Sequence, residues 1–167
     1  YFLIKVSKNL YNNIDWRNFM FSRFSEEAQK ALILAKKEMN NLRHPYVGSE
    51  HLFLSILSMR NLEITKVLSS YNITYEVFKK ELIRIVGIGK ESNEWFLYTP
   101  LLKRVIETAI LNSKEKCEVE VSVNELLLAI LEEGEGVAIR LLIGLNIDVD
   151  EIYNSISKDS KVRDRKS

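Results

Sequence analysis

The sequence holds few of the residues that interrupt helices and only one that could form a disulfide. Two of its 167 residues are proline, six are glycine and one is cysteine, Cys117. A single cysteine cannot form an internal disulfide, which argues against a disulfide-stapled extracellular domain. No apolar run approaches the roughly 18 residues that a membrane span needs, so no membrane partner is expected.

An excess of charge of one sign is also missing. Lys and Arg together number 24, Asp and Glu number 23, and the net charge is +1. Nucleic-acid-binding domains carry a basic patch or stripe, whereas most basic residues here are scattered among acidic ones, apart from the tail from Lys158 to Lys166. We therefore expect no nucleic acid among the partners.

Helical periodicity is what the sequence has in abundance. In residues 25–41 the apolar side chains recur at i, i+3, i+4 and i+7, which predicts an amphipathic helix. Ser25 is placed to cap it, with Glu26 and Glu27 at the positive end of its dipole. Three further helices are predicted: one capped by Ser49 and ending near 59, one over 62–71, and one over 75–86 that is capped by Thr74.

The same pattern returns at a constant offset of 74 residues, which aligns Ser25 with Thr99 and Leu54 with Leu128 without a gap. Nine of 59 aligned positions are identical, and they fall on the predicted apolar stripes with the helix caps in register. Thr99 followed by Pro100 is a strong helix start for the second copy. The sequence therefore predicts an all-α fold of two pseudo-symmetric four-helix repeats. These eight helices pack into one domain, because each repeat alone has too little core.

The chain divides into four predicted parts. Residues 1–23 form an amino-terminal arm, 24–87 the first repeat, 98–157 the second repeat, and 158–167 a charged linker. The arm is rich in aromatic side chains, which we expect to pack on the domain rather than to bind a partner. They are Tyr1, Phe2, Tyr11, Trp16, Phe19 and Phe21.

Sites for catalysis, cofactors or metals are not indicated. Residues 87–91 (GIGKE) lack the spacing of a phosphate-binding loop and are typical of a helix end. His44 and His51 have no cysteine nearby and are expected to cap or pack rather than to bind metal. Cys117 has no histidine beside it in sequence and is expected to be a spectator.

Four motifs resemble the amino-terminal domain of the Clp (caseinolytic) ATPases. They are residues 20–30 (MFSRFSEEAQK), 46–54 (YVGSEHLFL), 98–100 (YTP) and 131–138 (LEEGEGVA). Occurring in this order at the family's spacing, they extend the resemblance over about residues 20–157. The first motif and the spacing look most like the C type of bacteria and plastids.

The resemblance implies a domain that receives substrates and adaptor proteins for an unfoldase, which feeds the Clp peptidase. The parent would be hexameric, and ATP would bind only in an ATPase module beyond Ser167, with no cofactor in this domain. The alternative is a stand-alone accessory subunit without ATPase that docks on the peptidase, as in plastid proteins that share the double repeat. In neither case is this domain an enzyme.

A ligand is implied as well. In Gram-positive relatives this domain binds phosphorylated arginine, using the Ser or Thr that starts each repeat's first helix and the Glu of a Gly-Thr-Glu-His motif. The matching residues are Ser25 and Glu50 in repeat one, and Thr99 and Asn124 in repeat two. Asn124 lacks the charge that a guanidinium requires, so we expect at most one competent site, built on Ser25 and Glu50. The alternative is that these residues only cap helices.

Compartment is the last expectation. Up to Asn13 the chain contains lysines and no acid, as the remnant of a transit sequence would. We expect a plastid-type organelle, such as the apicoplast or the chloroplast stroma, with the bacterial cytoplasm as the alternative.

Overall fold

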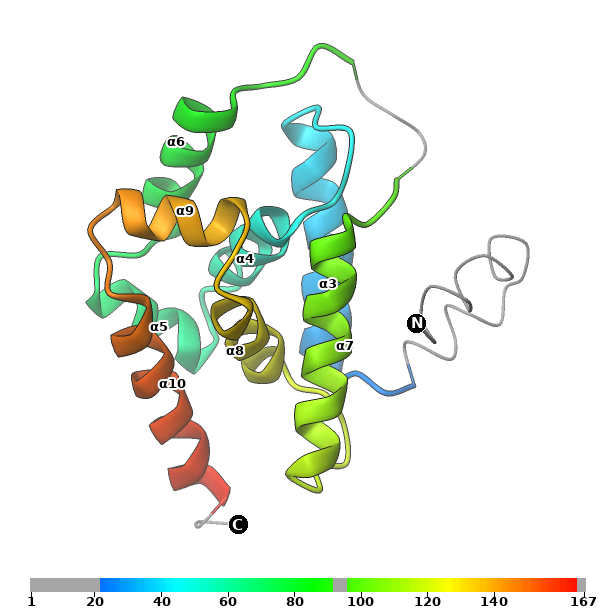
Figure 1. Ribbon diagram of the computed structural model, residues 1–167, viewed down its shortest axis with the longest axis vertical. Helices are drawn as coiled ribbons and strands as arrows, with labels where there is room; N and C mark the ends of the chain where they lie inside the picture. The colour runs from blue at the N-terminus through cyan, green and yellow to red at the C-terminus, as the bar shows by residue number, and fades with distance from the viewer. Residues whose placement is uncertain (1–21, 92–95, 165–167) are drawn as a thin grey trace.

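The computed structural model describes residues 22–91 and 96–164, where the chain forms eight helices (Figure 1). Their labels follow Figure 1 and their bounds are α3 (Glu26–Asn41), α4 (Ser49–Ser58), α5 (Glu63–Ser70), α6 (Tyr75–Val86), α7 (Pro100–Glu115), α8 (Val123–Glu133), α9 (Val137–Gly144) and α10 (Val149–Asp164). The all-α class is confirmed. The aromatic side chains of the predicted arm lie outside the described residues.

Backbone conformation shows the internal repeat directly. Arg43 and Cys117, which the repeat alignment pairs, follow the first helix of their repeats and have φ of 55° and 56°. Asn72 and Asn146, which the same alignment pairs, have φ of 61° and 59°. Left-handed backbone is uncommon for residues other than glycine. Its recurrence at equivalent positions therefore means that both repeats turn their chain in the same way after the same helices.

The core is built around α4 and α8, the most buried helix of each repeat. Every residue from Ser49 to Leu57 of α4 except Glu50 is buried, and α8 is buried from Glu125 to Leu131. These two helices contact each other, and α4 also contacts α3, α6, α7 and α9 (Figure 1). The last helix of each repeat reaches the other repeat, since α6 contacts α9 and α10 contacts α5. One continuous core results.

Two short parallel bridges exchange backbone between the repeats. Phe24, just before α3, pairs with Val121 in the loop before α8, and Tyr98, just before α7, pairs with Val47 in the loop before α4. Four backbone bonds of 2.8–2.9 Å hold them: Ser25 N–H to Val121 O, Val121 N–H to Arg23 O, Val47 N–H to Leu97 O, and Thr99 N–H to Val47 O. We call these pairings the crossover bridges. Each repeat thus anchors the start of the other repeat's first helix.

Most predicted helix starts are confirmed by their capping bonds. The Ser25 hydroxyl accepts the Ala28 N–H at 3.1 Å, and the Thr99 hydroxyl accepts the Leu102 N–H at 3.1 Å. The start predicted at Ser49 is wrong by one residue, because Gly48 is the cap and Ser49 is already helical. Gly48 needs no side chain there, since the His51 imidazole accepts its N–H at 2.9 Å.

The segment 158–167, predicted as a charged linker, is helical up to Asp164, because helix α10 continues to that residue. That segment contains no proline or glycine to end a helix.

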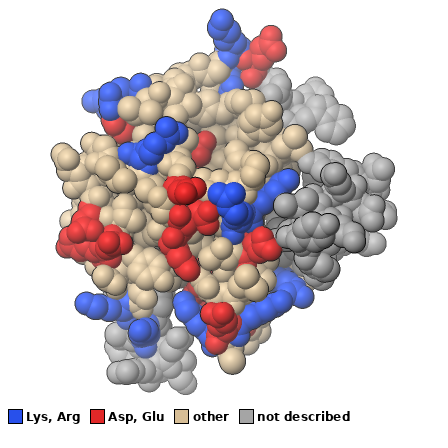
Figure 2. All heavy atoms as spheres, viewed as in Figure 1, with Lys and Arg blue, Asp and Glu red and all other residues tan. Residues whose placement is uncertain are grey.

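The surface in Figure 2 shows acidic and basic side chains interspersed, with no continuous basic stripe on that face. No helix in the described ranges is long and apolar enough to cross a membrane.

The repeat architecture predicts matched effects at equivalent core positions. Leu54 is 0% and Leu128 is 1% exposed, and they occupy aligned positions on α4 and α8. Truncating either to alanine should lower the free energy of unfolding by about 2–5 kcal/mol, because each leaves a cavity in packed surroundings. Leu111→Ala, at a residue 54% exposed, is the control and should change it by less than about 0.5 kcal/mol. Urea unfolding followed by circular dichroism measures all three variants. Wild-type stability in either core variant would contradict the repeat architecture.

Candidate functional site

The two histidines form a hydrogen-bonded chain behind the start of α4. The Gly48 N–H lies 2.9 Å from His51 Nδ1, His51 Nε2 lies 2.8 Å from His44 Nδ1, and His44 Nε2 lies 2.7 Å from the Gly87 carbonyl oxygen. Because an N–H can only donate and a carbonyl can only accept, each ring must be neutral with its proton on Nε2. The histidines therefore tie the loop before α4 to the end of α6.

The remaining chemical candidates are accounted for by local structure. Gly87 ends α6 with φ of 83°, and the Gly89 N–H donates to the Leu42 carbonyl. A side chain at Gly89 would overlap the Arg43 carbonyl, so residues 87–89 are fitted against the loop after α3. Cys117 is exposed. Among the described residues no group of three or more His, Cys, Asp or Glu side chains is arranged to hold a metal ion.

The crossover bridges decide which of the four predicted ligand-binding residues meet. Ser25 is bonded to Val121, three residues before Asn124, and Thr99 is bonded to Val47, three residues before Glu50. Ser25 and Glu50 are instead separated by α3, a helix of 16 residues and about 24 Å. The fold therefore does not bring together the pair expected within repeat one. It forms two composite junctions, Thr99 with Glu50 and Ser25 with Asn124.

At the Thr99–Glu50 junction three helices begin close together. A Cβ atom on Gly136, the cap of α9, would lie 2.1 Å from Leu101 Cδ2 of α7 and 3.3 Å from Ser49 Oγ of α4. The first turns of α7 and α9 contain no acidic residue. The Ser49 hydroxyl is 1% exposed and has no hydrogen-bond partner in the part of the chain that the structure describes. Free amide groups and positive dipole ends thus converge beside a buried, unpaired hydroxyl.

Glu50 supplies the negative charge of this junction. Its side chain is 14% exposed and folds back over Gly48, where an added Cβ would lie 2.3 Å from Glu50 Oε2. Burial raises the pKa of Glu50, while its own backbone N–H, His44 and Arg140 act in the opposite direction. Its carboxylate lies 3.7 Å from His51 Nδ1, but this is no ion pair because that nitrogen accepts a hydrogen bond in a neutral ring.

The Ser25–Asn124 junction has the same backbone and different chemistry. Helix α3 begins with Glu26 and Glu27, so carboxylates already lie at its positive end. At the positions that correspond to His44 and His51, repeat two has Glu118 and Glu125. Glu125 is buried and pairs with Lys116 at 2.6 Å. An additional anion is therefore less favoured here than at the Thr99–Glu50 junction.

Fold and site together define an all-α double-repeat domain in which helix starts of the two repeats meet at shared junctions. The family model for the Clp repeat N-terminal domain matches residues 23–145, and the chain belongs to this family. It is 34% identical over 137 residues to the "Negative regulator of genetic competence ClpC/MecB" of Bacillus subtilis, which covers 82% of this chain and 17% of that protein. It is 35% identical over 148 residues to an "ATP-dependent Clp protease ATP-binding subunit ClpA homolog" of Cyanidium caldarium, covering 87% and 17%. The chain thus spans about a sixth of the length of these relatives.

Solved structures show the same fold. The N-terminal domain of the chaperone ClpD from Arabidopsis thaliana superposes with a TM-score of 0.70 at 20% identity, covering 84% of this chain and 96% of that one. A ClpV N-domain in complex with a VipB peptide gives a TM-score of 0.61 at 20% identity, covering 81% and 86%.

The histidine chain makes stability sensitive to acid. Burial, and secondarily His44, lower the pKa of His51 from 6.5 to about 3, so the folded state resists a proton that the unfolded state accepts. The contribution of His51 to the free energy of unfolding is therefore fully present above about pH 6.5 and decreases as the pH falls toward 3. Lowering the pH from 7.5 to 5 should reduce the free energy of unfolding by about 2 kcal/mol through His51 alone. The raised pKa of Glu50 acts in the opposite direction, mainly above its usual value of 4.5.

Urea unfolding of wild type and His51→Gln at both pH values measures this difference. Glutamine does not titrate in this range, so the variant, although less stable at pH 7.5, should lose about 2 kcal/mol less on acidification. Equal losses in the two proteins would show that His51 is not held neutral.

Proposed function

We propose that this domain receives substrates and adaptor proteins for a Clp-family ATPase that unfolds proteins and passes them to the Clp peptidase. Membership of the Clp repeat N-terminal domain family supports this, as does the ClpV N-domain of the same fold in complex with a VipB peptide. In this proposal the domain is not catalytic, and ATP binds in a module outside this chain. The parent assembles as a hexamer and acts in a plastid-type organelle, with the bacterial cytoplasm as the alternative.

The proposed ligand is a phosphorylated arginine of a substrate, bound at the Thr99–Glu50 junction. The observation that carries this is Glu50, a mostly buried carboxylate beside three helix starts. A carboxylate accepts two parallel hydrogen bonds from a guanidinium, and the free amides of a helix start bind phosphate. The charge of Arg140 acts on the Glu50 carboxylate, so a cation also lies near this junction. The two halves of the ligand thus meet complementary groups.

The composite junction revises which residues form the one competent site. Thr99 and Glu50 form it, while Ser25 and Asn124 do not, because Asn124 is neutral and α3 starts with two carboxylates. The experiment therefore compares two junctions, one formed by Thr99 and Glu50 and the other by Ser25 and Asn124.

Calorimetric titration of phosphoarginine tests this proposal. Glu50→Gln keeps the side chain's shape and removes its charge, so affinity should fall about tenfold or more. Asn124→Ala is the matched control in the other junction and should bind as wild type does. Free arginine and free phosphate, each lacking half of the ligand, should bind more weakly than phosphoarginine. Absence of binding by wild type, or loss only in Asn124→Ala, would contradict the proposal.

A further inference from the structure

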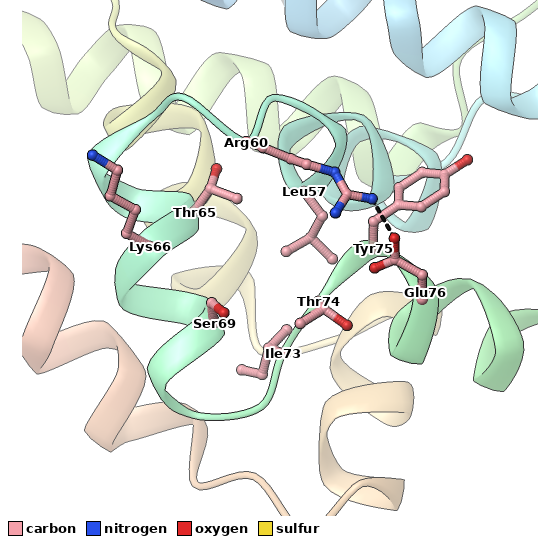
Figure 3. A pocket seen from close by; sticks show the side chains of 9 residues that line it. All are labelled: Leu57, Arg60, Thr65, Lys66, Ser69, Ile73, Thr74, Tyr75 and Glu76. Atoms are coloured by element: carbon pink, nitrogen blue, oxygen red, sulfur yellow. Dashed lines mark hydrogen bonds and ion pairs between the residues drawn. The ribbon is translucent and has the colours of Figure 1, made fainter.

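A cavity of about 270 Å³ opens at the carboxyl-terminal end of α4, the opposite end from the Thr99–Glu50 junction (Figure 3). It lies between α5 and the start of α6. Its floor is made by the buried side chains of Leu57 and Ile73, its wall includes Ser69 and Thr74, and Arg60 and Glu76 meet at its mouth. The cavity is smaller than a typical site for a drug-sized molecule, roughly 300–1,000 Å³, so it suits a single residue.

The mouth of the cavity is already built to hold a carboxylate. The Arg60 guanidinium donates to Glu76 Oε1. The pKa of Glu76 is held below its usual value by Arg60 first, then by its own backbone N–H, with a smaller contribution from the Thr74 hydroxyl. A guanidinium, an amide at the first turn of a 12-residue helix and a hydroxyl therefore converge on one carboxylate. Glu76 occupies the place that an incoming carboxylate would take.

Glu76 is held there only loosely. The Arg60 and Glu76 side chains are 68% and 61% exposed, and ion pairs between exposed side chains contribute little to stability. The Ser69 hydroxyl makes no hydrogen bond to another described residue. Lys66 also lines the cavity, but its ammonium group pairs with Glu63 at 3.3 Å, whereas the Arg60 guanidinium meets Glu76 at the mouth. A ligand that brings its own carboxylate and also covers the apolar floor can displace Glu76.

We infer that this cavity binds the carboxyl-terminal residue of another polypeptide, with an aliphatic side chain on Leu57 and Ile73 and the terminal carboxylate on Arg60. A chain end carries both groups on one carbon atom. An internal acidic residue does not, because successive side chains of an extended segment point to opposite sides. Of the two repeats that the structure describes, only repeat one offers this site, since repeat two has Leu131 and Ile147 at the positions of the aliphatic floor but Gly134 where repeat one has Arg60.

The test is an NMR titration of the ¹⁵N-labelled chain with a short peptide ending in leucine. The free acid should shift the amide signals of residues 73–77, and the same peptide with an amidated terminus should not. Arg60→Gln should weaken binding about tenfold or more. Glu76→Gln should tighten it by a few fold, because it removes the internal competitor.

Arg84→Gln is the matched control for the loss of a cation. Arg84 is also exposed and also pairs with a glutamate of α6, Glu81, but it does not line the cavity. This variant should bind the peptide as wild type does. Equal binding of the acid and the amide, unchanged affinity in Arg60→Gln, or no binding by either wild type or Glu76→Gln would overturn the inference. Phosphoarginine titration of Arg60→Gln should match wild type, which separates this site from the Thr99–Glu50 junction.

Discussion

The crossover bridges are the constraint on which the rest of the structure depends. Each uses two backbone hydrogen bonds, and each places the start of one repeat's first helix against the loop that leads into the other repeat's central helix. Phe24, Val47 and Val121, which form three of the four bridge positions, are buried in the shared core. Neither repeat can be removed without exposing apolar surface and unpaired backbone groups in the other. The bridges also determine which helix starts meet at each junction.

Duplication has preserved the backbone and changed the chemistry at its edges. The left-handed turns recur at aligned positions of the two repeats, and the central helices keep matching leucines and isoleucines. By contrast, His44 and His51 correspond to Glu118 and Glu125, and Glu50 corresponds to Asn124. Core positions are restricted by packing, because adding or removing even one methylene group there alters stability. Positions at the junctions can change more freely. The two repeats therefore share one architecture but present different side chains at their junctions.

Local elements of this fold could be predicted from the sequence because their causes are local. Ser25, Thr74 and Thr99 cap their helices as expected, since a hydroxyl bond to an amide three residues on depends only on neighbours in sequence. The prediction at Ser49 fails because the group that satisfies Gly48 is the His51 ring, which a capping rule for hydroxyl side chains does not consider. Helix α10 runs on to Asp164, into the charged segment, because charged residues alone do not end a helix.

The pairing of the site residues could not be predicted by the same means. Periodicity assigns Ser25 and Glu50 to one repeat, but it carries no information on which repeat each helix start contacts. That information lies in the bridges, whose trace in the sequence is slight: Val47 aligns with Val121, and Phe24 aligns with Tyr98. The cavity beside Arg60 and Glu76 escapes sequence reasoning for a related reason. Its lining comes from three helices and the loops between them, and its mouth is formed by the contact between Arg60, in the turn after α4, and Glu76 of α6.

Interdependence of the repeats is the central claim, and separating them tests it most directly. Residues 1–91 can be expressed with ¹⁵N label, and residues 96–167 without label, so that NMR spectra report on repeat one alone and after mixing. We predict poorly dispersed amide signals for repeat one alone, and a dispersed spectrum once an equimolar amount of repeat two is added. A dispersed spectrum of the isolated repeat that does not change on mixing would contradict the account.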